Sequence, residues 1–427
     1  MTQRILSAMA SAPAKVLEGI FAINKPQSLS SAQVIRDLQI KFAESKTFAP
    51  LLEETRNAAR ENGSKRRRVS KENVFKIGHG GTLDPLATGI LIIGLGRGTK
   101  HLSGFLECKK TYETVVLFGK STTTYDVAGK VVAEAPTSSI TRAAVEEQLV
   151  KFRGKSKQIP PIYSAIKIDG MKLYDYARTG KELPRELESR DIEVSDCTLL
   201  DFWEAGEHDF RYPAEQASDE EKATTKKIME GVTATKESMA KNRSEAKSDI
   251  LAAKAGENSL PPAQKAALHT HPLPTQESEP AQAPAARIRL TVSSGFYVRS
   301  FCHDLGINCG SWGTMAALIR SQQSDFTTLD PAPEGFVTAL TYEDLDAGEE
   351  VWGPKIRPVL EKWLDQHPPG SQPPAREAGG VDNQGRNNGK SFKRVKGIGG
   401  QKKSWNNKER DYSSPQTRRR NSSSPEA

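Results

Sequence analysis

The sequence predicts an α+β fold, a mixed sheet with helices on its flanks. Segments 112–118 and 287–292 have the composition of strands, and the second places its apolar side chains at every other position. Segment 30–42 instead repeats its apolar residues at helical spacing. The strands are separated both by short turns and by helices, which is typical of a mixed sheet with flanking helices.

A short apolar strand at 20–23 opens the patterned part of the chain. The helix at 30–42 follows, with Ser30 or Ser31 as its N-cap, because a hydroxyl there accepts a hydrogen bond from the first helical turn. The buried face of this helix consists of Val34, Leu38 and Phe42. The later elements are, in order, strand 112–118; helix 144–152 with Val145, Leu149 and Phe152, ending at Gly154; helix 173–180, ending at Gly180; and strands 190–200 and 287–292.

Stretches without this patterning divide the chain into one folded domain, two inserts and a tail. They are rich in charged residues or in Pro, Gly and Ser, and they lack a hydrophobic period, so we expect them to be disordered. The predicted parts are a flexible N-terminus at 1–15, a folded domain at 16–364, a basic insert at 44–72 that ends in KRRR (65–68), an acidic low-complexity insert at 204–286 and a disordered basic tail at 365–427.

The formal charge of the chain, +8, is concentrated at its C-terminal end. Residues 366–427 hold 13 Lys/Arg and 5 Asp/Glu, so the remainder of the chain is neutral. A neutral body with a basic tail favours an anionic polymer such as nucleic acid as the partner. A tail that only increases solubility is the competing interpretation.

Four cysteines form no CxxC pair, and with seven scattered histidines they indicate neither a disulfide framework nor a metal site. Reduced thiols in an intracellular protein fit this pattern. No apolar run approaches the roughly 18 residues of a membrane span and no signal peptide is visible, so we expect no membrane partner. The first 17 residues carry Arg4 and Lys15 but no acid, which is a weak signature of a transit peptide.

The segment richest in chemical information is the loop GHGGTLDPLATG, residues 78–89. Three glycines within four positions permit close approach of the backbone to a ligand. Pro85 restricts Asp84 to extended geometry, and the apolar run after the loop must be buried. Asp84 is therefore a candidate nucleophile, and an aspartate that merely caps a turn is the competing interpretation. The loop lacks the GxxxxGK[ST] pattern of a phosphate-binding loop.

This loop resembles the signature of the TruB family of pseudouridine synthases, in which the nucleophilic aspartate sits in G-[TA]-L-D-P-x-A-x-G. Four further blocks occur in the family's order: FAINKPQSLSSAQVI (21–35), KTYETVVLFGKSTTTYDVAGKVV (110–132), FRGKSKQIPPIYSAIKIDGMKLYDYARTG (152–180) and SSGFYVRSFCHDLG (293–306). The resemblance implies the pseudouridine synthase fold, with a mostly antiparallel sheet, and an isomerase that uses no cofactor and no metal.

The resemblance also implies catalytic roles. Asp84 adds to the target nucleotide and breaks, or accompanies the breaking of, the glycosidic bond, so that uracil can rotate and rejoin through C5. Tyr112 stacks on the target base, and Arg299 pairs with Asp84, keeping it ionised and oriented. Tyr297, two residues before Arg299 on the same face of a strand, lines the pocket. Core packing is the competing interpretation for both tyrosines.

Four further residues are expected to bind RNA. His79 fills the space left when bases leave the stack, unless it only bonds to backbone. Asp126 contacts the flipped-out neighbour of the target, while Thr123 replaces an aspartate that the family often has and affects a secondary contact only. Lys25 supports the loop, touches phosphate or is solvated. Lys167 stands in the family's S-A-x-K block.

Together these features predict a monomeric tRNA pseudouridine synthase that acts on uridine 55 in the T-arm, with T-loop-like sites in mRNA as further substrates. A guide-RNA-dependent enzyme of the dyskerin type shares the loop, but the chain offers no patterned length for its PUA domain. A noncatalytic RNA chaperone is the other alternative, although every expected active-site residue is present. KRRR indicates nuclear import or RNA contact, with a solvated run of charges as the competing interpretation. We expect a nuclear protein, with the mitochondrion as the alternative.

Overall fold

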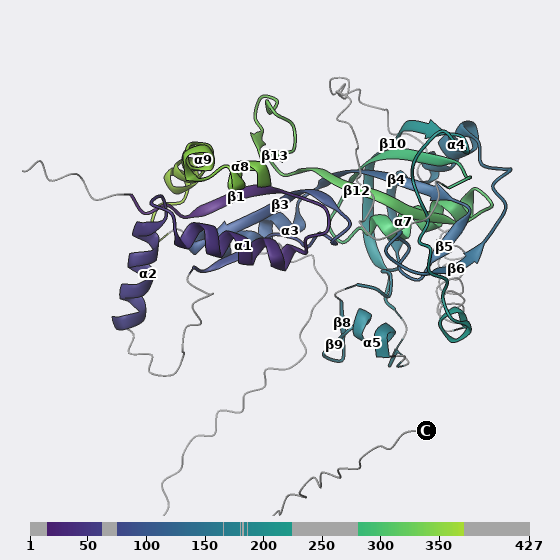
Figure 1. The fold of residues 1–427 in the computed structure, drawn as a ribbon, viewed down its shortest axis with the longest axis horizontal. Coiled ribbons are helices and arrows are strands. Elements are labelled where there is room, and N and C mark those ends of the chain that lie inside the picture. Colours follow the sequence, from purple (N-terminus) through teal and green to yellow (C-terminus); the bar gives the residue numbers. More distant parts are fainter. Residues whose placement is uncertain are drawn as a thin grey trace, which may run out of the picture. The chain divides into compact units, whose positions relative to one another are not determined.

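A ten-stranded mixed sheet runs through the part of the chain that the computed structural model describes, residues 15–61, 75–223 and 281–370 apart from 165, 180, 182 and 186. Its main strands lie in the order β1 (Gly19–Lys25), β3 (Thr88–Leu95), β12 (Gly313–Gln323), β4 (Lys110–Phe118), β11 (Ala285–Val292), β10 (Arg190–Trp203) and β7 (Gly154–Gln158) (Figure 1). Only β3 and β12 are parallel along this path. The α+β fold with a mostly antiparallel sheet is confirmed.

Short strands extend this sheet and form two small ones. β2 (Ile77–His79) pairs with β3, β13 (Phe326–Thr327) pairs with β12, and β14 (Val337–Thr338) pairs with β13. The two-stranded sheets are β5 (Lys120–Thr122) with β6 (Val131–Glu134), and β8 (Lys167–Ile168) with β9 (Met171–Lys172).

Helices α1 and α4 form where apolar residues recur at helical spacing and a hydroxyl caps the first turn. Ser30 accepts a hydrogen bond from Gln33 N–H, and Thr141 accepts one from Ala144 N–H. The helices are α1 (Ser31–Ala43), α2 (Ala49–Glu61), α3 (Leu102–Glu107), α4 (Arg142–Phe152), α5 (Leu173–Thr179), α7 (Val298–Asn308), α8 (Tyr342–Asp346) and α9 (Glu349–Gln366), with a 3₁₀ turn at Gly96–Lys100. The predicted helices at 30–42, 144–152 and 173–180 are confirmed, except that Gly180 lies outside the described residues.

Strands β1 and β3 are apolar on both faces because they separate two layers of core. Phe21 and Ile93 point into the main core with α1. Ile20 and Ile92, one position away, point to the other face and pack against Trp363 of α9. The loop between β2 and β3 is therefore attached to a strand that is held from both sides.

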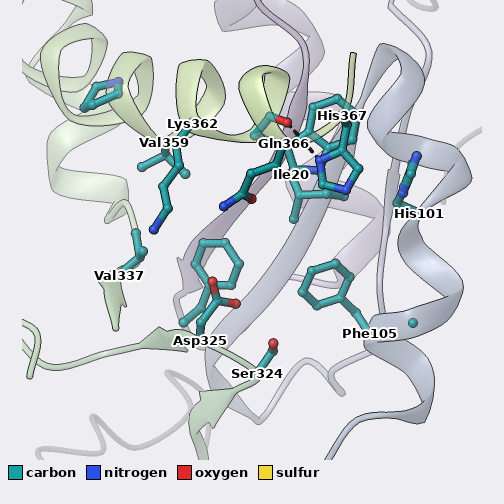
Figure 2. Close-up of a pocket in the computed structure, with 14 residues that line it drawn as sticks. Ile20, His101, Phe105, Ser324, Asp325, Val337, Val359, Lys362, Gln366 and His367 are labelled. Atoms are coloured by element: carbon teal, nitrogen blue, oxygen red, sulfur yellow. Dashed lines mark hydrogen bonds between the residues drawn. The ribbon is translucent and has the colours of Figure 1, made fainter. Parts of the chain in front are cut away.

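The smaller core layer contains a hollow of about 480 Å³ between α3, α9 and β13 (Figure 2). Phe105, Asp325 and Lys362 line it, and the His367 ring stacks on Trp363 with centroids 4.3 Å apart. None of the residues predicted for catalysis or RNA binding lines this hollow. The predicted chemistry is placed elsewhere in the fold.

The expectation that 44–72 lacks a hydrophobic period is wrong for its first half. Phe48, Leu51 and Leu52 are buried at one face of α2, where Phe48 stacks with Trp352 of α9. Their spacing is that of an amphipathic helix, which the abundance of charged residues further along obscured. Residues 62–74, with the KRRR cluster, lie outside the described residues.

The acidic insert predicted at 204–286 is also shorter than expected. Phe210 packs against the main core, and Tyr212 donates a hydrogen bond to the carbonyl of Phe118. Ala217 is buried, while 224–280 lie outside the described residues. Isolated aromatic residues in a charged segment were the missed sign of packing.

The predicted boundary at 365 also moves, because α9 continues to Gln366 and His367 packs on it. Residues 1–14 and 371–427, which contain most of the predicted flexible N-terminus and basic tail, lie outside the described residues. Among the helices of the described residues, none combines the length and apolar character that a membrane span needs.

Gly89 of β3 lies against the backbone of Arg320 of β12, and its replacement tests this close approach. Its φ is +99°, and an added Cβ would lie 2.3 Å from the carbonyl oxygen of Arg320. We expect Gly89→Ala to lower the free energy of unfolding by about 3 kcal/mol, measured by urea denaturation, because strain and overpacking add. Gly104→Ala on α3, where nothing lies within 4 Å, is the control and should leave stability unchanged or slightly raised. Equal curves for both variants would contradict the close approach.

Candidate active site

Asp84 lies on the loop between β2 and β3, and its neighbours fix the loop to the core. Leu83 and Leu86 are buried, whereas the Asp84 side chain is 41% exposed. The Ala87 N–H donates to the Asp84 carbonyl at 3.1 Å, which closes a turn around Pro85. Apolar side chains on both sides of Asp84 thus anchor the loop while the carboxylate stays open to a ligand.

Ser31, at the start of α1, binds the same loop. Its hydroxyl accepts the Leu83 N–H at 2.9 Å and donates to the Leu83 carbonyl at 3.1 Å. The Ser28 N–H donates to the Pro85 carbonyl at 2.8 Å. A loop without regular secondary structure must satisfy its backbone groups from elsewhere, and the connection between β1 and α1 provides these partners.

Lys25 is fully buried beneath the loop, and this position contradicts the prediction that it binds RNA. Its ammonium donates to the carbonyls of Pro26 and Leu29, both at 2.8 Å, and of Pro85 at 3.4 Å. Burial lowers its pKa to about 8, although the Asp84 charge opposes this shift. Of the roles considered from sequence, support of the loop is the one that this geometry fits.

Two loop contacts come from β12 and were not predicted. Arg320 is 2% exposed, and its guanidinium donates to the Ile90 carbonyl at 2.7 Å and to the Gly81 carbonyl at 3.2 Å. The Gln323 amide donates to the Gly80 carbonyl at 2.8 Å. An arginine directly after the apolar run of β12 was the available signal, because a charge there requires buried partners.

The prediction that Arg299 and Tyr297 lie on one face of a strand is wrong. Tyr297 is the N-cap of α7 and Arg299 lies in its first turn. Phe301, Cys302 and Leu305 are buried at helical spacing, and this period was overlooked behind the glycine and serine residues before it. Tyr297 is held through its backbone, whose N–H and carbonyl bond to the side chain of Gln158.

The Arg299 guanidinium gathers the site around Asp84. Its Nε lies 3.0 Å from Asp84 Oδ2 and 3.7 Å from Asp126 Oδ2. Its Nη atoms donate to the carbonyls of Thr124 at 3.0 Å and Tyr163 at 2.8 Å. Since the Arg299 side chain is 9% exposed, these four partners compensate a charge that is largely removed from water.

Asp126 is buried beside Arg299 and lies near the same Nε atom as Asp84. Its Oδ1 accepts the Thr124 hydroxyl at 2.5 Å and the Ala128 N–H at 3.1 Å. Burial raises the pKa of Asp126 even though Arg299 acts in the opposite direction. Of these three charged side chains, Asp84 is the most accessible to a ligand. A contact of Asp126 with RNA stays a prediction.

The remaining predicted residues occupy distinct positions. Tyr112 is a buried residue of β4 and pairs with Arg320 of β12. His79 ends β2; its Nδ1 is buried without a hydrogen-bond partner, and burial, with Arg320 nearby, lowers its pKa. Lys167 is exposed in the small β8–β9 sheet. Their RNA contacts stay predictions. No group of three or more His, Cys, Asp or Glu suited to a metal ion occurs among the described residues.

An exposed carboxylate that is held by a nearly buried guanidinium on an anchored loop is suited to nucleophilic attack. The fold and this site therefore fit the pseudouridine synthase class that the sequence motifs predict, and the nucleophilic role of Asp84 stays a prediction.

Comparison with known proteins identifies the family. Residues 66–219 match the N-terminal domain of TruB family pseudouridylate synthase. The chain is 38% identical to tRNA pseudouridine synthase 4 of Schizosaccharomyces pombe, over 73% of this chain and 80% of that protein. It is 35% identical to tRNA pseudouridine synthase 4 of Saccharomyces cerevisiae, over 82% and 85%. It is 48% identical to tRNA pseudouridine synthase B of an Azoarcus species, over 32% and 44%. The chain belongs to the TruB family of pseudouridine synthases.

The low pKa of Lys25 has a measurable effect on stability. Between pH 8 and the ordinary lysine value of 10.5, the unfolded chain binds more protons than the folded one, so the free energy of unfolding rises with pH. From pH 7 to 9 we expect wild-type protein to gain about 1 kcal/mol relative to Lys25→Met, measured by urea denaturation at each pH. Parallel pH curves for the two proteins would show that Lys25 titrates as a solvated lysine.

Proposed function

We propose that this chain converts uridine 55 in the T-arm of tRNA to pseudouridine and that it acts as a monomer. T-loop-like sites in mRNA are further substrates. The observation that carries the proposal is the 3.0 Å ion pair between Asp84 and Arg299, with Asp84 the accessible carboxylate of the cluster. Membership of the TruB family and relatives that are named tRNA pseudouridine synthases support the choice of substrate.

In the proposed reaction, Asp84 Oδ attacks the target nucleotide as the glycosidic bond to N1 breaks. The freed uracil rotates and its C5 attacks C1′ of the sugar, and the bond between Asp84 and C1′ breaks as the new carbon–carbon bond forms. The C5 proton is released to solvent and N1 takes up a proton. Arg299 holds the attacking carboxylate in place, and the buried loop contacts of Lys25 and Arg320 limit its movement. The base is isomerised without net oxidation or reduction.

The exposure pattern supports recognition of a base that has left its stack. Asp84 is open, whereas the side chains of Tyr112 and Asp126 are buried. A uridine inside folded RNA reaches such a carboxylate only when it is extruded. His79, at the end of β2, is the proposed wedge that fills the vacated space.

Two alternative functions predict different outcomes when pseudouridine formation is assayed without an added guide RNA. A guide-RNA-dependent synthase requires an added guide, and an RNA chaperone binds RNA without isomerising it. Release of tritium from tRNA that contains [5-³H]uridine, with no guide added, supports the proposal against both. No release from full tRNA under conditions where the RNA is bound would contradict it.

Asp84→Asn tests the nucleophile. We expect pseudouridine formation to fall below about 1% of the wild-type rate, because covalent catalysis contributes several kcal/mol, while RNA affinity stays within a few-fold. Asp325→Asn, in the hollow that contains none of the predicted site residues, is the matched control and should keep full activity. Residual turnover above about 1% in Asp84→Asn would exclude Asp84 as nucleophile.

The T-arm alone tests the substrate. A stem-loop with the T-arm sequence should be modified with a kcat/KM within about tenfold of full tRNA, a difference of about 1.4 kcal/mol, because unstacked loop bases carry the recognition. Opening the stem should cost more than any change in the tRNA body. An inert stem-loop beside efficiently modified tRNA would place recognition outside the T-arm.

A further inference from the structure

A strained turn lies directly behind the Arg299 guanidinium. Tyr125 has φ +62°, a left-handed conformation that side chains other than glycine rarely adopt. Its N–H donates to the Thr122 carbonyl at 3.3 Å, and its carbonyl accepts the Met315 N–H of β12 at 2.9 Å. Such a conformation persists only when the surroundings hold it in place, so the contacts of the tyrosine ring must be considered.

The Tyr125 ring is part of a stack of three aromatic side chains. It lies on the His303 ring with centroids 4.0 Å apart and an interplanar angle of 15°. His303 in turn stacks on Trp312 at 5.5 Å and 14°, and its Nδ1 lies 3.4 Å from the Ser121 hydroxyl. His303 is 4% exposed, so the stack is anchored in the interior and only Tyr125 extends to the turn.

Thr124 and Asp126, on either side of Tyr125, are two of the residues that bind Arg299. The Thr124 carbonyl accepts from Arg299 Nη1 at 3.0 Å, and Asp126 Oδ2 lies 3.7 Å from Nε. Arg299 and His303 are four residues apart on α7 and therefore project from the same face of the helix. The helix thus holds the turn twice, through the guanidinium and through the aromatic stack.

We propose that Tyr125 and His303 are positioning residues for the reaction, which act by holding Thr124 and Asp126 so that Arg299 aligns Asp84. The expected effects on reaction rate rest on the proposed function of the chain as a pseudouridine synthase. Neither ring needs to touch substrate. Without the stack, the turn loses its attachment to α7 even where its backbone keeps the left-handed conformation. The Thr124 carbonyl and the Asp126 carboxylate that bind Arg299 are then no longer held in fixed positions.

Tyr125→Gly removes the aromatic ring but permits the same backbone conformation, because glycine adopts a positive φ without cost. The variant should therefore remain folded. We expect its single-turnover rate at saturating RNA to fall by about 30-fold, since small displacements of catalytic groups have effects of this order, while RNA affinity stays within about threefold. Tyr125→Phe keeps the stack and should stay within about threefold of wild type in both quantities. Ser324→Gly, which relieves a φ of +54° in the hollow instead, is the control and should have no effect.

A double-mutant cycle tests the route through Arg299. In an Arg299→Lys background, Tyr125→Gly should cause little further loss of rate, because the interaction that the stack serves is already disrupted. Full additivity of the two substitutions would overturn the proposal. A single-turnover rate of Tyr125→Gly within threefold of wild type would also overturn it. So would a fall in rate that is matched by an equal fall in RNA affinity and accompanied by a lower midpoint of unfolding, because the ring would then support the fold as a whole.

A structural measurement keeps the inference testable if the proposed activity fails. In protein labelled with ¹⁵N-arginine, the Nε–H resonance of Arg299, identified by its disappearance in Arg299→Lys, should be sharp and protected from exchange in wild type and Tyr125→Phe. In Tyr125→Gly it should broaden or exchange at least about tenfold faster. An unchanged resonance in Tyr125→Gly would overturn the proposal whatever the enzyme acts on.

Discussion

The nearly buried guanidinium of Arg299 is the interaction on which the site depends. A charge removed from water in this way is tolerated only if its donors are satisfied, and the two carboxylates and two carbonyls around it do so. The side chain of Asp126 is 7% exposed and that of Asp84 is 41% exposed, so Asp84 is the accessible carboxylate. The cost of burying one cation thus fixes the position of the reactive carboxylate.

A second constraint comes from the loop that carries Asp84. It has no regular secondary structure, so its carbonyls must find donors, and the buried cations Lys25 and Arg320 supply them from β1 and β12. Gly89, at the start of β3, allows the loop to approach β12 closely, since a larger residue would collide with the Arg320 backbone. The loop is rigid because neighbouring elements hold its backbone, and the position of Asp84 follows from that rigidity.

The sequence was a good guide wherever periodicity and motif agreed. The alternation in β11 and the spacing in α1 and α4 predicted those elements, and the loop motif singled out Asp84. The first turn of α7 was misassigned because glycine and serine residues precede it, and its helical period becomes evident only with Phe301, Cys302 and Leu305. Lys25 could not be placed, since a buried cation differs from a solvated one only by tertiary partners. For Arg320 the one local signal was its position directly after the apolar run of β12. The aromatic stack of Tyr125 and His303 joins distant segments and leaves no local signal.

The central claim is that Arg299 serves alignment of Asp84 and not binding of RNA. Arg299→Lys tests it most directly, because lysine keeps the charge but lacks the planar array of donors that reaches Asp84, Thr124 and Tyr163 together. Single-turnover rate and RNA dissociation constant should be measured on the same T-arm substrate. We expect the rate to fall by about 100-fold with affinity within about threefold. A rate close to wild type, or an equal loss in affinity, would contradict this account.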